Sequence, residues 1–175
     1  MSPGAPSIPT QNDAAGGPSE RRFNLLLSYA GWDSDPWVER LPRLLDPMGV
    51  HSIRAGSGRE ATRVIQQSPV HVAVVDLGLP FDAAVSEPGH SPAPTPEGGI
   101  RLLDLLQRLD QPPPTVVIKR GRSARDDRRE IAAALRAGAF AVLDRPRETT
   151  DLELMLQVLQ RILRRHYQGR WPDPN

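Results

Sequence analysis

The chain has 175 residues, a length typical of one domain with additional segments at its ends. Its 22 Lys and Arg residues nearly balance 21 Asp and Glu residues, and the net charge of +1 argues against a globally basic nucleic-acid binder. It has no Cys, which excludes disulfides and thiolate metal sites, and its four His residues lack close ligand spacing. With no apolar run of the roughly 18 residues that a membrane span needs and no apolar signal core, we expect a cytoplasmic protein.

The composition divides the chain into one domain and two tails. Residues 1–21 are rich in Pro, Gly, Ser and Ala and hold almost no large apolar side chains, so we expect a disordered tail. We expect the domain over residues 22–167 and a short tail at residues 168–175, with no further domain after it. Within the domain, residues 81–97 carry several prolines, which predicts a long flexible loop.

Short apolar runs alternate with helix-like segments along the predicted domain. We expect strands at residues 24–29, 50–55, 70–76, 115–118 and 139–143. Helical spacing predicts a helix that starts at Pro36 and is broken by Gly49, and further helices at residues 57–67, 100–109, 124–137 and 150–167. Pro42 should kink the first helix or delay its start. Thr150 and Glu153 have the spacing of a capping box for the last helix.

Five strands that alternate with five helices are typical of a doubly wound α/β fold. Right-handed crossovers then place helices on both faces of one parallel sheet. In such a sheet the carboxyl ends of the strands form the ligand-binding edge. Asp76 ends an apolar run that starts at Val70, and Gly78 and Pro80 follow it closely. We therefore expect Asp76 at this edge, in a position to act on a ligand. The alternative is that Asp76 only starts a turn.

Positive charge is concentrated in one part of the chain. Between Lys119 and Arg147 there are nine Lys and Arg residues and four Asp and Glu residues. One interpretation is a solvated helix face with intrahelical pairs such as Asp126 with Arg129. The other is a surface that meets an acidic partner or nucleic acid.

Several local patterns, taken in order, resemble the receiver domain of two-component response regulators. They are Gly49-Val50, Ala55-Gly56-Ser57-Gly58-Arg59-Glu60-Ala61, Val75-Asp76-Leu77-Gly78-Leu79-Pro80, Gly98-Gly99-Ile100-Arg101-Leu102-Leu103, Ala137-Gly138-Ala139 and Arg145-Pro146. The resemblance runs from about Phe23 to Leu163. It implies a flavodoxin-like sandwich with the strand order 2-1-3-4-5, a role in phosphorelay signal transduction, and no enzymatic activity beyond self-catalysed phosphoryl transfer.

The resemblance also implies roles for individual residues. Asp76 matches the aspartate that accepts a phosphoryl group, with a histidine kinase or phosphotransfer protein as the partner. In the family an acidic pair at the end of the first strand holds Mg²⁺, but here that strand runs into Ser28-Tyr29-Ala30. Asp33 and Asp35 are then the candidates to join Asp76 in a Mg²⁺ site, and they are equally suited to cap the helix that follows.

Two further positions depart from the family pattern. Lys119 stands where the family has a Thr or Ser, and Arg145 stands where it has a Lys, which keeps the charge but changes the hydrogen-bond geometry. Val142 replaces the family's aromatic switch residue. Strand order brings Lys119 and Arg145 to the same edge as Asp76, so we expect a divergent receiver or pseudo-receiver whose Asp76 is poorly phosphorylated or locked by cations.

Two other functions are consistent with the same residues. Gly56 and Gly58 fit the glycine pattern of a dinucleotide-binding turn, and Asp76 ends the next strand, where such folds place the acid that binds a ribose. Alternatively, the strand at residues 139–143 and its flanking helices form an interaction surface for a second copy or another signalling protein. With only a short tail after the last helix, output is expected through protein contacts.

Overall fold

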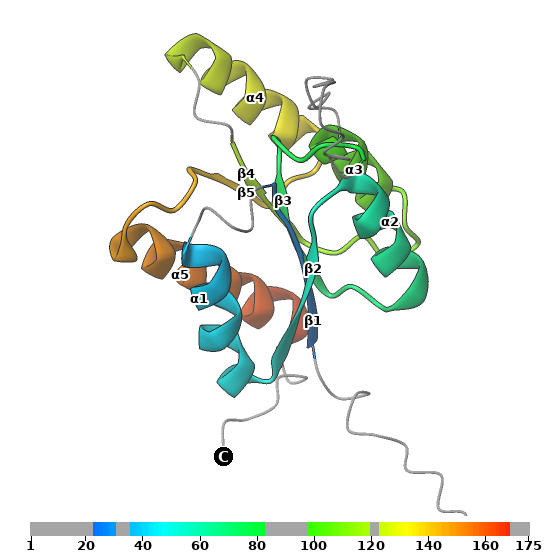
Figure 1. The fold of residues 1–175 in the computed structure, drawn as a ribbon, viewed down its shortest axis with the longest axis vertical. Coiled ribbons are helices and arrows are strands. Elements are labelled where there is room, and N and C mark those ends of the chain that lie inside the picture. Colours follow the sequence, from blue (N-terminus) through cyan, green and yellow to red (C-terminus); the bar gives the residue numbers. More distant parts are fainter. Residues whose placement is uncertain (1–22, 31–35, 83–97, 120–122, 169–175) are drawn as a thin grey trace, which may run out of the picture.

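The chain folds around one five-stranded parallel sheet with helices on both of its faces (Figure 1). The computed structural model describes residues 23–30, 36–82, 98–119 and 123–168. The strands are β1 (Phe23–Ser28), β2 (Val50–Ala55), β3 (Val72–Asp76), β4 (Thr115–Ile118) and β5 (Ala141–Leu143). They lie in the order β2-β1-β3-β4-β5, which confirms the predicted flavodoxin-like topology.

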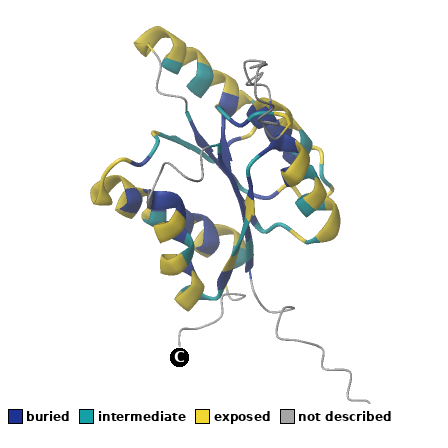
Figure 2. Ribbon diagram, in the orientation of Figure 1, coloured by how far each residue is buried: buried dark blue, intermediate teal, exposed yellow. Residues whose placement is uncertain are grey.

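The central strands are buried on both faces, as continuous apolar sequence predicts for a parallel sheet. All five residues of β3 are buried, and β3 pairs with β1 on one side and with β4 on the other. In register, Asp76 lies opposite Ile118 at the carboxyl end of β4. Figure 2 shows the buried strands inside two layers of helices with exposed outer faces. This topology places the acidic side chain at the edge where ligands bind in such folds.

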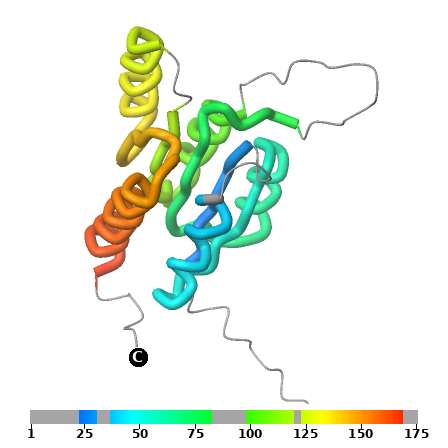
Figure 3. The backbone as a smooth tube through the Cα atoms, turned by 60° about the vertical axis from the view of Figure 1, so that its left-hand side comes forward, coloured from blue at the N-terminus to red at the C-terminus, as the bar shows by residue number. Residues whose placement is uncertain are grey.

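Helices connect the strands in chain order. They are α1 (Pro36–Leu45), the short 3-10 helix η2 (Asp46–Met48), α2 (Gly58–Gln67), α3 (Gly98–Gln107), α4 (Ala124–Arg136) and α5 (Thr149–Tyr167). Residues from α1 and α5 pack on one face of the sheet, and residues from α2, α3 and α4 pack on the other. Figure 3 shows α4 and α5 on one side of the molecule and α2 on the opposite side. None of the described helices is long and apolar enough to cross a membrane.

Two glycines let α3 start directly against the loop that follows β3. A Cβ atom at Gly99 would collide with the backbone of Asp76 and Leu77, and one at Gly98 would collide with the backbone of Pro80. Helix α3 therefore begins at Gly98, two residues before the predicted start at Ile100. Close packing, which a propensity-based prediction cannot see, decides this boundary.

The predicted cap of the last helix is wrong. The capping box is formed by Glu148 and Asp151, whose side chains each accept a hydrogen bond from the other residue's backbone amide, and not by Thr150 and Glu153. Both pairs have the same spacing, and the earlier pair is used because the helix starts at Thr149. Pro42 lies inside α1, which nevertheless begins at Pro36. Gly138 has a φ of 86°, as expected for a left-handed residue after a helix.

Candidate functional site

Asp76 is the most deeply buried charged residue at the carboxyl edge of the described sheet. It is fully buried, with an exposed fraction of 0%. Its Oδ1 atom accepts a hydrogen bond of 2.7 Å from the backbone amide of Gly78, and the backbone amide of Ala30 donates another to its carboxylate. The loops after β1 and β3 therefore both hold this carboxylate. They do so through backbone amides, whose positions cannot be predicted from a sequence motif.

Arg145 supplies the cation that faces this carboxylate. Its Nη2 atom lies 3.4 Å from Oδ2 of Asp76, and its side chain is 41% exposed. This separation is longer than the roughly 2.8 Å of a strong charge-assisted hydrogen bond, so the contact is mainly electrostatic. The expected pairing of Asp76 with Arg145 is thus found.

The surroundings of Asp76 raise the pKa of its carboxyl group. Burial raises the pKa of the carboxyl, while the amide of Gly78, the charge of Arg145 and the amide of Ala30 lower it by a smaller amount. The net result is a pKa above the ordinary 3.8. A carboxylate with a raised pKa at a binding edge is typical of a functional site, although structural networks can produce the same shift.

Two aromatic side chains support Arg145 from below. The Arg145 guanidinium lies 5.0 Å from the centroid of the Tyr29 ring, within the range of a cation–π interaction. Tyr29 in turn meets Trp37 edge to face at 4.9 Å, and both rings are buried. Tyr29 directly follows β1. An aromatic ring in contact with a cation therefore occupies the position where receiver domains have acidic residues. An aromatic residue at that strand end was the signal that sequence reasoning missed.

Lys119 does not pair with Asp76, contrary to expectation. Its ammonium lies 2.7 Å from Oδ2 of Asp127 on α4 and 3.0 Å from Oδ1 of Asp144 after β5. The hydrogen bonds that the Lys119 ammonium donates to these two carboxylates raise the pKa of Lys119. The Asp76 carboxylate already accepts two amides and faces Arg145, whereas Asp127 and Asp144 offer partially exposed oxygens. Lys119 therefore ties the start of α4 to the loop after β5.

The described residues do not fit a Mg²⁺ site. Mg²⁺ requires several oxygen ligands in near-octahedral geometry, and no three His, Asp or Glu residues gather within the described parts of the chain. Around Asp76 the β1 end contributes Ser28 and Tyr29, and the nearest charge is the Arg145 cation. The other two predicted ligands, Asp33 and Asp35, lie outside the described residues.

The Gly56–Gly58 turn does not offer a free phosphate cradle. Its amides are already used: Gly56 donates to the Glu60 carboxylate at 2.7 Å, and Gly58 donates to the Pro80 carbonyl at 2.8 Å. The amide of Glu60 donates to the Ser57 hydroxyl, which caps α2. The amide of Gly58 instead connects α2 to the loop after β3, and the dinucleotide-binding interpretation is not favoured.

The predicted helix pair Asp126–Arg129 is not among the ion pairs of the described residues. Asp126 instead interacts with Ser123, which caps α4: the Ser123 hydroxyl donates to the Asp126 carboxylate at 2.7 Å and accepts from its amide. The N-terminal turn of α4 is therefore held by its cap and by Lys119.

Fold and site together define a flavodoxin-like domain that carries a buried acid at the carboxyl edge of its sheet. No protein-family model matches the chain, and the search of curated proteins found no match. Solved structures do match, and those with the highest probability are response regulators or their receiver domains.

Three of these structures illustrate the similarity. A two-component response regulator from Clostridium difficile is 18% identical with a TM-score of 0.62, over 84% of this chain and 100% of that chain. The receiver domain of response regulator 1452 from Francisella is 19% identical with a TM-score of 0.56, over 82% and 99%. A response regulator from Burkholderia pseudomallei, solved with a phosphorylated aspartic acid, a calcium ion and citrate, is 22% identical with a TM-score of 0.55, over 79% and 66%. At these identities the similarity establishes the fold.

Proposed function

We propose that this chain is a signal-receiver domain in which Asp76 accepts a phosphoryl group and Arg145 supplies the neighbouring cation. The observation that carries the proposal is the Asp76 carboxylate itself. It is buried at the carboxyl edge of a receiver-type sheet, held by the Gly78 amide at 2.7 Å, and faced by Arg145 at 3.4 Å. A structural core residue would not need an acid, whose burial is costly.

In the proposed step, the ionised Oδ2 of Asp76 attacks the phosphorus atom of the donor. A new oxygen–phosphorus bond forms as the bond between phosphorus and the donor breaks. The leaving group takes the electron pair of that bond: acetate leaves from acetyl phosphate, and the imidazole of a kinase's phosphohistidine, which carries a proton on its other ring nitrogen, leaves as a neutral ring. Oδ2 is the oxygen that faces the guanidinium, so Arg145 lies where charge on the phosphoryl group develops.

Two features of the site make this reaction slow. The raised pKa of Asp76 means that its nucleophilic carboxylate forms at a higher pH than that of an ordinary Asp. Asp76 is also fully buried, so a donor reaches it only after a neighbouring group moves. Arg145 has room to move, since its side chain is 41% exposed. The proposal is therefore a divergent receiver with slow phosphorylation.

The proposed site uses a guanidinium in place of a divalent metal. The support for this proposal is the position of Arg145, which faces Asp76 at 3.4 Å and contacts the Tyr29 ring at 5.0 Å. A cation that belongs to the protein is present whatever the concentration of metal ions. It also offers planar, directional hydrogen bonds to phosphoryl oxygens.

For partners, we propose a histidine kinase or phosphotransfer protein as the donor, and protein contacts as the output. The side of the molecule formed by α4, β5 and α5 is the candidate surface for a downstream protein or a second copy of the chain. Lys119 connects the carboxyl edge of the sheet, where Asp76 lies, to this side of the molecule, because its two partners belong to α4 and to the loop after β5.

The proposal is tested by incubating the chain with acetyl phosphate and weighing it intact over time. We expect a slowly forming adduct with the mass of one phosphoryl group. Asp76→Asn should abolish it, while Asp104→Asn, which changes an exposed acid on α3, should leave it intact. An adduct that persists in Asp76→Asn, or no adduct at all, would contradict the assignment of Asp76.

A further inference from the structure

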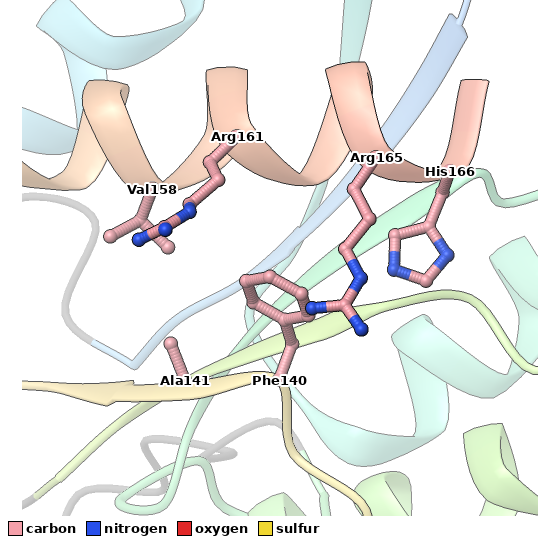
Figure 4. Close-up of a pocket in the computed structure, with 6 residues that line it drawn as sticks. All are labelled: Phe140, Ala141, Val158, Arg161, Arg165 and His166. Carbon is pink, nitrogen blue, oxygen red and sulfur yellow. The ribbon is translucent and has the colours of Figure 1, made fainter. Parts of the chain in front are cut away.

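A groove lies between the start of β5 and the C-terminal half of α5, at the end of the sheet opposite Asp76. It has a volume of about 480 Å³. Its lining consists of Phe140, Ala141, Val158, Arg161, Arg165 and His166. Figure 4 shows the Phe140 ring pointing up from the strand and Arg161 and Arg165 reaching down from the helix. Apolar groups therefore form the floor of this groove, and cationic groups form its wall.

The wall carries positive charge that no carboxylate of the described residues pairs with. Residues 154–167 of α5 include Arg161, Arg164 and Arg165 and no Asp or Glu. None of these three arginines forms an ion pair with a described carboxylate. Cations in the last turn of a helix complement its dipole, which accounts for Arg164 and Arg165. Arg161 lies one turn earlier, outside the reach of that effect.

Phe140 orders the groove before any ligand arrives. The guanidinium of Arg165 lies 6.0 Å from the centroid of the Phe140 ring, and the His166 ring meets the same ring edge to face at 5.9 Å. Holding Arg165 in place in this way reduces the entropy that binding would otherwise cost. β5 is also an edge strand of the sheet, so one of its sides lacks a neighbouring strand.

We propose that this groove binds an acidic peptide segment of a partner protein, with one large apolar side chain of that segment seated on Phe140 and Val158. Charge complementarity carries the choice, because carboxylates of the segment would pair with Arg161 and Arg165. Aromatic and arginine side chains at the centre of a contact commonly provide most of its binding energy. The proposal extends the protein-contact output proposed above by naming the chemistry of the partner.

Fluorescence anisotropy with labelled synthetic peptides tests this directly. The probe is a short peptide of Asp and Glu residues around one central Phe, titrated with the full chain. We expect binding that weakens when Gly replaces the central Phe, when Asn and Gln replace the acids, or when salt is raised. The Arg161→Ala/Arg165→Ala variant should bind about tenfold more weakly or worse. Equal binding by this variant, or by the uncharged peptide, would overturn the proposal.

A matched variant controls for the loss of two charges. Arg63→Ala/Arg108→Ala removes two exposed arginines away from α5 and should bind the acidic peptide like the unmodified chain. Phe140→Ala should remove the preference for the peptide with the central Phe while keeping the salt dependence. Thermal melting followed by circular dichroism shows that each variant is folded before it is compared.

Two other occupants have distinct signatures. Tighter binding of single-stranded oligothymidine, lost in Arg161→Ala/Arg165→Ala, would replace the peptide with nucleic acid and overturn the proposal. Dimers of the unmodified chain in analytical ultracentrifugation, absent for the same variant, would show that a second copy fills the groove, with the same consequence.

The outcome is separable from that of the proposed function. Should the peptide fail to bind while Asp76 still takes up a phosphoryl group, only the groove proposal fails. Should it bind while Asp76 forms no adduct, only the phosphoacceptor proposal fails. Phosphorylation of the Arg161→Ala/Arg165→Ala variant is expected to match that of the unmodified chain, because the groove and Asp76 lie at opposite ends of the sheet.

Discussion

The guanidinium of Arg145 and the carboxylate of Asp76 meet across 69 residues of sequence, with Nη2 3.4 Å from Oδ2. One partner is fully buried and amide-bound, whereas the other is 41% exposed and rests on an aromatic ring. The acid is therefore the fixed part of the site, and the cation is the part with freedom to move.

Replacing Asp76 with Asn is expected to raise the melting temperature at neutral pH. Burial raises the pKa of Asp76 above 3.8, so the folded state binds the proton more tightly than the unfolded chain does. Stability then falls as pH rises from the ordinary pKa through the raised one, and above that window the ionised buried acid costs its full penalty. Asn has no such penalty, so melting curves of the two proteins should differ most near about pH 7 and converge near about pH 4.

The exposed Asp104→Asn change is the control for this comparison and should shift the melting temperature little at either pH. A stabilisation by Asp76→Asn that is as large in acid as at neutral pH would contradict the raised pKa. A destabilisation at neutral pH would show that the contacts of the carboxylate outweigh the cost of its burial.

Changing Arg145 to Leu should slow phosphorylation of Asp76 by acetyl phosphate by about tenfold or more, because the site loses its only close described cation. Arg145→Lys keeps the charge and should give an intermediate rate. Initial rates of adduct formation, read from intact masses, check both. Arg147→Leu, which removes an exposed arginine two residues away, should leave the rate unchanged. Equal rates for the Leu variant and the unmodified chain would show that Arg145 does not assist phosphorylation of Asp76.

Lys119 is expected to stabilise the fold through α4 and not to act at Asp76. Lys119→Met should lower the free energy of unfolding by about 1 kcal/mol, at the upper end for a partly exposed pair, because its side chain is only 14% exposed. Urea unfolding of single and double variants would measure the coupling. The coupling with Asp127, which is 19% exposed, should exceed that with Asp144, which is 75% exposed. A tenfold loss of phosphorylation in Lys119→Met would contradict this separation of roles.

Gly99 and Gly58 differ in how well they tolerate a side chain. Gly99→Ala places a Cβ against the backbone of Asp76 and Leu77 and should cost about 3 kcal/mol of unfolding free energy. Gly58→Ala is the matched control, since its Cβ would meet neighbours at 3.4 Å and 3.5 Å, an ordinary contact distance. We expect a change within about 0.5 kcal/mol there. Similar losses at both positions in urea unfolding would show that α3 does not pack as closely as described.

The order of elements was predictable because each short apolar run is separated from the next by a helix-like pattern. The bounds of β2 and β4 were predicted to the residue, since Gly49 precedes one and the triple proline at residues 112–114 precedes the other. A predicted position was wrong where two pairs of residues fitted the same pattern equally well. The capping box at Glu148 and Asp151 has the same spacing as Thr150 and Glu153, and the two pairs differ only in where they start the helix.

The sequence allowed us to predict which residues lie at the carboxyl ends of the strands. It did not allow us to predict the directions in which their side chains point. Strand order alone brings Asp76 and Arg145 to one edge, and this was confirmed. Lys119 lies at the same edge but turns to Asp127 and Asp144, whose positions depend on how α4 and the loop after β5 fold. The support that Tyr29 gives to Arg145 joins residues far apart in the chain, and no local motif reports such a contact.

The metal dependence of phosphorylation tests the central claim most directly. The initial rate of Asp76 adduct formation with acetyl phosphate would be measured by intact mass in the presence of Mg²⁺ and in the presence of EDTA. We predict a slow reaction with the same rate in both, because Arg145 supplies the cation. A rapid adduct that forms with Mg²⁺ and is absent with EDTA would contradict the account.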